Sequence, residues 1–161
     1  ARKRKKENTM AMNLQGLKSV VALGPVSLAS AATAMSSTID AKGYEELQLV
    51  VTRTTHATDY ITTLTIQNSD TDVASNFATI TGYVQGTDYS AASLSGGTNA
   101  ATEKAAGVFN IDLRGKKRYF RVGVTNGAVV AVIGVTGTLA RPEQAPITAT
   151  LQNASVVVNP S

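Results

Sequence analysis

Residues 46–53 read ELQLVVTR and give the clearest strand pattern in the chain. Leu47, Leu49 and Val51 occupy every second position, so an extended backbone points their side chains to the same face. Gln48 and Thr52 lie on the opposite face, which suits contact with solvent. The stretch therefore predicts a β-strand that covers a hydrophobic core with one of its two faces.

Further β-prone runs flank this strand. Upstream, Gly24 and Pro25 separate two short apolar runs. Downstream, the loop TTHATD at 54–59 and the turn-forming NSDTD at 68–72 delimit two more. The upstream apolar runs are LKSVVAL at 17–23 and VSLA at 26–29, and downstream lie the predicted strand YITTLTIQ at 60–67 and the β-prone run FATITGYV at 77–84.

The second half of the chain predicts a three-stranded meander. VFNIDL at 108–113 and RYFRVGV at 118–124 both alternate, and the four residues between them suit a β-hairpin loop. Asn126-Gly127 then precedes AVVAVIGVTGTLA at 128–140, and Asn-Gly is a strong signal for a two-residue hairpin turn. We therefore expect each of these strands to pair antiparallel with the next one in the chain.

Composition favours a single all-β domain. The chain has 161 residues, of which 43% are hydrophobic and 5% aromatic, and it has no cysteine, which excludes disulfides and thiolate sites. Abundant Thr, Ser and Gly suit strands and turns. We predict an antiparallel, jelly-roll-like β-sandwich over residues 16–140. Residues 85–107 are predicted to be surface loop with one helical turn around AATEKAAG, ended by Gly107.

The formal net charge of +4 is concentrated at the N-terminus. Residues 1–7 hold five of the fifteen Lys and Arg residues and one of the eleven Asp and Glu residues, which leaves ten of each sign elsewhere. We predict a basic N-terminal arm over residues 1–15. An extended C-terminal arm is predicted over residues 141–161, where Pro142 and Pro146 interrupt regular pairing and the arm can add to a neighbour's sheet edge.

Two stretches resemble a group of small head decoration, cement or minor structural proteins that are encoded beside the capsid genes of tailed phages. They are STIDAKGYEELQLVV at 37–51 and GKKRYFRVGVT at 115–125, followed by the exit LARPEQAPI at 139–147. The resemblance implies a jelly-roll-like sandwich on the outside of an icosahedral head, at threefold positions. It also implies two partners, the major capsid protein and copies of this chain in a trimer.

No residue pattern for catalysis or for a cofactor is found in the sequence. His56 is the one histidine and lies in a loop without the other ligands or triad members that a metal site or nucleophile needs, so we expect it to be solvated. Asp70 and Asp72 fit a turn better than a calcium loop, which needs a Gly and a closing Glu at fixed spacing. Asp40, Glu45 and Glu46 are expected to be surface charges. We predict a protein that is not an enzyme and has no metal or cofactor.

Two basic clusters are candidate partner-binding sites. In the first, the arm either lies across an acidic capsid surface or neutralises nucleic-acid phosphates, the less favoured alternative. The second surrounds the predicted hairpin and either contacts an acidic neighbour or forms a solvated turn. The arm residues are Arg2, Lys3, Arg4, Lys5 and Lys6, and the hairpin residues are Arg114, Lys116, Lys117, Arg118 and Arg121.

The leading functional hypothesis is a decoration or cement protein on the capsid exterior of a virion, synthesised in the host cytoplasm. A shell protein that contacts the genome through its basic arm is the first alternative, and a head-completion or tail component is the second. The sequence has no apolar run of about 18 or more residues and no apolar signal core after the basic start, so we expect no membrane partner.

Overall fold

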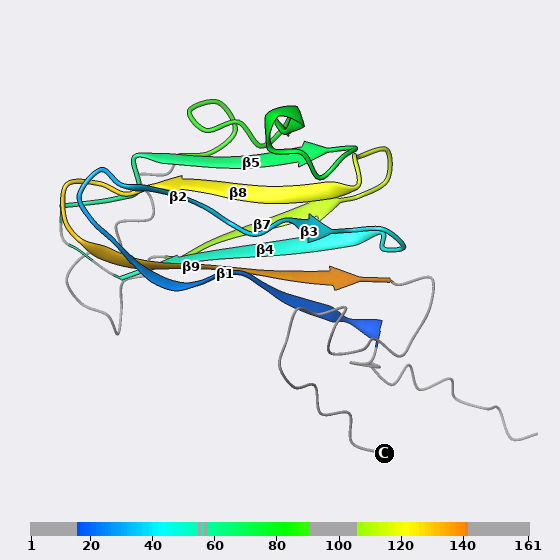
Figure 1. Ribbon diagram of the computed structural model, residues 1–161, viewed down its shortest axis with the longest axis horizontal. Helices are drawn as coiled ribbons and strands as arrows, with labels where there is room; N and C mark the ends of the chain where they lie inside the picture. The colour runs from blue at the N-terminus through cyan, green and yellow to red at the C-terminus, as the bar shows by residue number, and fades with distance from the viewer. Residues whose placement is uncertain (1–15, 55, 57, 91–105, 142–161) are drawn as a thin grey trace, which may run out of the picture.

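The structure is a computed structural model that describes residues 16–54, 56, 58–90 and 106–141. Two antiparallel sheets are stacked face to face (Figure 1). Sheet A has the order β1 (Lys18–Leu28), β9 (Ala131–Ala140), β4 (Glu46–Arg53), β7 (Ala106–Asp112). Sheet B has the order β2 (Thr33–Met35), β8 (Tyr119–Thr125), β5 (Thr63–Ser69), β6 (Ala78–Thr79), and β3 (Ile39–Asp40) also pairs with β8. The predicted all-β antiparallel sandwich is confirmed.

Strand β4 forms where the sequence predicts it and lies in the middle of sheet A. Leu47, Leu49 and Val51 are between 0% and 1% exposed, so the two-residue period does face the core. On one side β4 pairs with β7, and on the other it pairs with β9, where Leu49 lies opposite Gly137. A Cβ at Gly137 would stand 3.0 Å from Cδ1 of Ile39 in sheet B, so the missing side chain allows the sheets to approach closely there.

The core lies between the inner faces of the two sheets. Phe120 is fully buried and is the largest of its side chains. Burial of apolar surface on both inner faces is the main stabilising contribution to such a sandwich. The principal core residues are Leu47, Leu49, Val51, Ile133, Val135 and Leu139 from sheet A and Leu64, Ile66, Phe120, Val122 and Val124 from sheet B.

The predicted meander is wrong. β7 pairs with β4 in sheet A, whereas β8 pairs with β5, β2 and β3 in sheet B, so the expected hairpin partners lie in different layers. The next connection also crosses, because β9 pairs with β1 and β4 in sheet A. The three strands themselves were predicted correctly. Each strand turns one apolar face toward the core. The alternation that marks this face is the same whether two consecutive strands pair in a hairpin or lie in different sheets, so it could not predict the pairing.

Other predicted strand bounds are also corrected. The two upstream apolar runs form one strand, β1, which continues through Gly24 and Pro25 with irregular register between Val21 and Val26. β5 begins at Thr63, later than predicted, and the run at 77–84 contributes only the two residues of β6. A short 3-10 helix, Ala74–Asn76, precedes β6.

The predicted N-terminal arm and all of the predicted C-terminal arm except Arg141 lie outside the described residues, as do most of the predicted surface loop and most of the expected helical turn. Gly107, predicted to end that turn, lies within β7. Among the described residues, no helix has both the length and the apolar character needed to cross a membrane.

The alternation along β4 predicts unequal effects of two adjacent substitutions. Leu49→Ala removes a fully buried side chain from the core and should lower the free energy of unfolding by about 2–5 kcal/mol. Val50→Ala, on the half-buried outer face, should cost less than about 1 kcal/mol. Urea unfolding followed by circular dichroism measures both, and equal losses would contradict the assignment of the two faces.

Candidate functional site

The connections at one end of the sandwich carry most of the charged side chains of the described residues, and we call this the charged end. It consists of residues 40–46, 70–72, 112–118 and 141, on the right of Figure 1. β1 begins and β9 ends beside it, since Lys18 pairs with Leu139. Its charged residues are Asp40, Lys42, Glu45, Glu46, Asp70, Asp72, Asp112, Arg114, Lys116, Lys117, Arg118 and Arg141.

Two of the predicted hairpin cations form bidentate contacts with carboxylates of their own chain. Arg118 binds Asp40 with distances of 2.8 Å and 2.6 Å, and Arg114 binds Asp112 with a shortest distance of 2.7 Å. The hydrogen bonds from Arg118 are the main reason why the pKa of Asp40 is lowered. Those from Arg114 likewise lower the pKa of Asp112 to about 2. Both carboxylates are therefore ionised and occupied at neutral pH.

Of the other three predicted hairpin residues, Lys116 and Lys117 also lie at the charged end, whereas Arg121 does not. Arg121 lies on sheet B, where its guanidinium donates to Gln67 at 2.8 Å and stacks on the Phe77 ring, 4.2 Å from the centroid. Lys117 is 3.8 Å from a carboxylate oxygen of Asp70. Within the described part of the chain, Lys116 makes no ion pair. The five cations therefore do not form one free basic patch.

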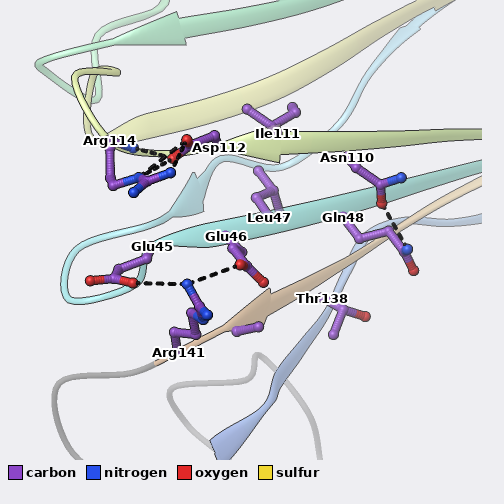
Figure 2. A pocket seen from close by; sticks show the side chains of 11 residues that line it. Glu45, Glu46, Leu47, Gln48, Asn110, Ile111, Asp112, Arg114, Thr138 and Arg141 are labelled. Atoms are coloured by element: carbon purple, nitrogen blue, oxygen red, sulfur yellow. Dashed lines mark hydrogen bonds and ion pairs between the residues drawn. The ribbon is translucent and has the colours of Figure 1, made fainter.

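An open groove of about 500 Å³ lies at the charged end of sheet A (Figure 2). Arg141 stands between two carboxylates there, 3.5 Å from Glu45 and 3.4 Å from Glu46. Further along the groove, Gln48 donates a hydrogen bond to Asn110 at 2.9 Å. Exposed ion pairs of this kind contribute little to stability, so a partner's charges can replace them at small cost.

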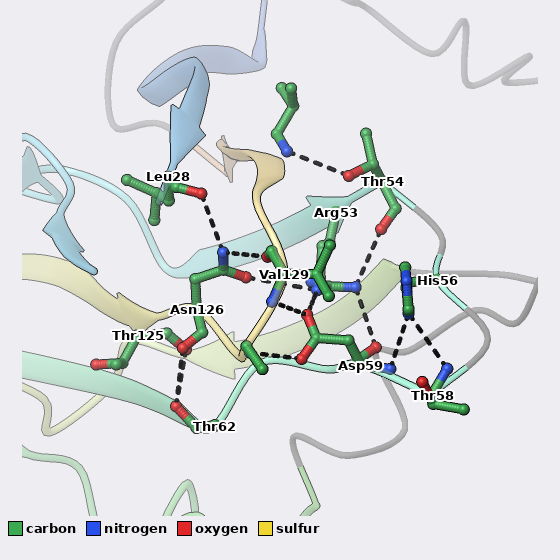
Figure 3. Close-up of polar contacts among 12 residues, drawn as sticks. Leu28, Arg53, Thr54, His56, Thr58, Asp59, Thr62, Thr125, Asn126 and Val129 are labelled. Atoms are coloured by element: carbon green, nitrogen blue, oxygen red, sulfur yellow. Dashed lines mark hydrogen bonds and ion pairs between the residues drawn. The ribbon is translucent and has the colours of Figure 1, made fainter. Parts of the chain in front are cut away.

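The opposite end of the sandwich contains a buried polar network (Figure 3). Arg53, the last residue of β4, forms an ion pair with Asp59, and the side chains are only 1% and 9% exposed. The same guanidinium donates to the carbonyl oxygen of Asp59 at 3.1 Å. Asp59 accepts hydrogen bonds from the backbone N–H groups of Ala128 at 2.7 Å and Val129 at 3.3 Å. The Asp59 carboxylate therefore joins the β4–β5 connection to the β8–β9 connection and to the end of β4.

Asn126 extends the network to β1. Its side-chain amide is fully buried and donates to the carbonyl oxygens of Leu28 at 3.0 Å and Val129 at 2.8 Å. The next position, Gly127, has no room for a side chain, because a Cβ there would lie 2.1 Å from Oδ1 of Asp59 and 2.4 Å from the carbonyl oxygen of Tyr60. Asn126-Gly127 thus lies in a connection between the two sheets, where the Asn126 side chain bonds to the end of β1. The predicted two-residue hairpin turn is wrong.

His56 takes part in the same region, contrary to the expectation that it is merely solvated. Its Nδ1 accepts hydrogen bonds from the backbone N–H groups of Asp59 at 3.1 Å and Thr58 at 3.3 Å. Burial acts to raise the pKa of Asp59, but the backbone donors and the charge of Arg53 outweigh it, so the pKa is lowered. The histidine therefore orders the loop that carries the buried carboxylate.

The sequence patterns considered above do not predict this network, although the sequence contains a signal for two of its members. Arg53 continues the inward row of β4 at the same period, and Asn126 continues the inward row of β8. A charged or amide side chain at an inward position needs buried partners. Nothing comparable marks Asp59, whose role depends on the path of a loop.

Within the described residues, no group of three or more His, Asp or Glu side chains is placed to hold a metal ion. The arm residues Arg2, Lys3, Arg4, Lys5 and Lys6 lie outside the described residues. In comparisons with known proteins, no protein-family model and no curated protein matches this sequence.

The buried ion pair predicts a pH-dependent contribution to stability. Because the pKa of Asp59 is lowered by folding, its carboxylate stabilises the fold above the unfolded-state pKa of about 3.9. This contribution is lost as the pH falls through the folded-state pKa. Asp59→Asn leaves Arg53 buried without a charged partner and should cost about 3–5 kcal/mol at pH 7.

Urea unfolding at pH 7 and at pH 3 tests this, and the difference between wild type and Asp59→Asn should shrink at pH 3. Asp70→Asn, which removes an exposed carboxylate, is the control and should cost less than about 1 kcal/mol. Similar losses for the two variants at pH 7 would contradict a structural role for the buried pair.

Proposed function

We propose that this chain is a non-enzymatic virion structural protein that decorates and cements the capsid exterior of a tailed phage. The proposal combines the order of the strands, the pairing of the body's charges and the basic arm. Its partners are the major capsid protein and other copies of the chain.

The strand order carries the proposal. β2 and β3 both pair with β8 and can be counted as one edge strand, so that each sheet has four strands. Among the described strands, only β5 and β6 are then both consecutive in sequence and adjacent in a sheet. Eight strands in two sheets, joined almost entirely by crossing connections, support a jelly roll, an architecture found in viral capsid and lectin domains. A shared fold does not specify function, so the surfaces must support it as well.

The charges of the body support an external partner for the arm. Six of the eight described carboxylates are paired with cations of the body, and the other two accept hydrogen bonds from neutral groups, so the described carboxylates form no cluster of unpaired acids for the five arm cations. The contacts are Asp40 with Arg118, Glu45 and Glu46 with Arg141, Asp59 with Arg53, Asp70 with Lys117, Asp72 with Thr38, Asp88 with the N–H of Val84, and Asp112 with Arg114. An acidic capsid surface would supply the missing anions.

The position of the described chain ends adds to this support. Lys18 and Leu139 are paired at the charged end, so both predicted arms begin from the same end of the sandwich. Two arms that contact adjacent subunits raise each other's effective concentration at the capsid surface. This is the physical basis that we propose for cementing.

Neutralising the arm tests the proposal. Replacing Arg2, Lys3, Arg4, Lys5 and Lys6 with Gln should leave the circular dichroism spectrum unchanged. Co-sedimentation with capsids of the major capsid protein encoded in the same genome should weaken by about 10- to 100-fold, because one attachment point is lost. The matched control, Arg2→Lys with Arg4→Lys, keeps every charge and should bind as wild type. Unchanged binding by the neutralised chain would refute the proposed role of the arm.

A shell protein that contacts the genome is the second candidate, favoured by the same jelly-roll order together with a basic arm. It predicts that this chain alone assembles closed particles and that its affinity for nucleic acid falls steeply with salt through the arm. Electron microscopy of the purified chain and a salt titration of DNA binding separate it from decoration, which predicts neither result. A head-completion or tail role is distinguished by the position of the chain in cryo-EM maps of the particle.

A further inference from the structure

Among the described residues, the end of the sandwich opposite the charged end carries few charged side chains, and we call it the apolar end. It consists of residues 29–33, 58–62 and 126–132, which belong to the β1–β2, β4–β5 and β8–β9 connections and to the first residues of β2 and β9, on the left of Figure 1. The one charged side chain in these three segments is Asp59, which is buried and paired with Arg53.

Large apolar side chains project from this end into solvent. Val130 is 63% exposed, and Tyr60, Val132 and Val129 are about 40% exposed. Their segments lie side by side: Ala31 N–H donates to the carbonyl oxygen of Gly127, and Ala128 N–H donates to the carboxylate of Asp59, next to Tyr60. Exposed aliphatic side chains gathered in adjoining connections are a recognised mark of interaction surfaces.

The backbone beneath these side chains is held rigidly. Val129 donates its N–H to Asp59 and accepts a hydrogen bond from Asn126 through its carbonyl oxygen. Both backbone polar groups of Val129 are therefore satisfied inside the protein, while its side chain is partly exposed. A surface ordered in advance loses little conformational entropy when it binds.

We propose that the apolar end is the surface through which copies of this chain associate with one another. In a symmetric oligomer a patch near the axis meets its own copies, so any charge on it would face a like charge. The apolar end satisfies this condition, because its single charge is buried and neutralised. The mixed and exposed charges of the opposite end do not.

Charge also argues against a charged partner at this end. An acidic or basic protein docked here would lose hydration without gaining a counter-charge. A second copy offers a surface of the same neutral, apolar chemistry. This assembly deepens the proposed function, on which it rests: contact through the apolar ends leaves the charged ends, where both arms begin, free for the capsid.

Sedimentation velocity of the full chain over a concentration series, without capsids, tests the inference. Wild type should form an oligomer, and Val130→Asp should weaken association by more than about 100-fold, because like charges would meet across the interface. Val108→Asp is the matched control, since Val108 is a valine of similar exposure, 55%, on β7 in sheet A, and it should associate as wild type.

A charge swap adds a readout that loss of folding cannot imitate. Val130→Lys alone should also dissociate, whereas an equal mixture of Val130→Asp and Val130→Lys should recover association through opposite charges. A monomeric wild type, equal loss in Val108→Asp, or no recovery in the mixture would overturn the inference. Because capsids are absent, such a failure is distinct from failure of the arm to bind the capsid.

Discussion

The buried network of Arg53, Asp59 and Asn126 is the interaction on which the arrangement of the two sheets depends most directly. Hydrogen-bonded ladders fix the strands within each sheet, but apolar contacts between sheets are not directional. The connections that cross between layers therefore need another constraint. The network supplies it by joining the β1–β2, β4–β5 and β8–β9 connections through contacts of defined geometry. Within the network, Arg53 also pairs with Asp59, the one charged side chain in the segments of the apolar end.

The two ends of the molecule consequently differ in chemistry. At the charged end, six carboxylates are balanced by three guanidinium and three ammonium groups, so this end has no net negative charge to attract the basic arm. At the apolar end, valine side chains project from a backbone whose polar groups are satisfied internally. We propose that the first end turns toward the capsid and the second toward other copies of the chain.

Much of the fold could be predicted from alternation along single strands. β4, β7, β8 and β9 were all identified, because a two-residue period marks one buried face whatever lies beside the strand. Their pairing could not be predicted, since a hairpin and a connection between layers bury the same face. The candidate site followed the same rule. The cations at 114–118 were found as a charge cluster, but their acidic partners come from distant segments, such as Asp40 for Arg118.

The sequence by itself determined that the chain forms strands, that they have one apolar face each, and that its net charge resides in the first seven residues. These are local properties, set by the period of the side chains and by composition. Only the tertiary structure decided which strands are neighbours, and only it placed Asn126-Gly127 in a connection between the two sheets. It also showed that the body's carboxylates are already occupied. Those properties depend on contacts between residues far apart in the chain, and local sequence patterns do not encode such contacts.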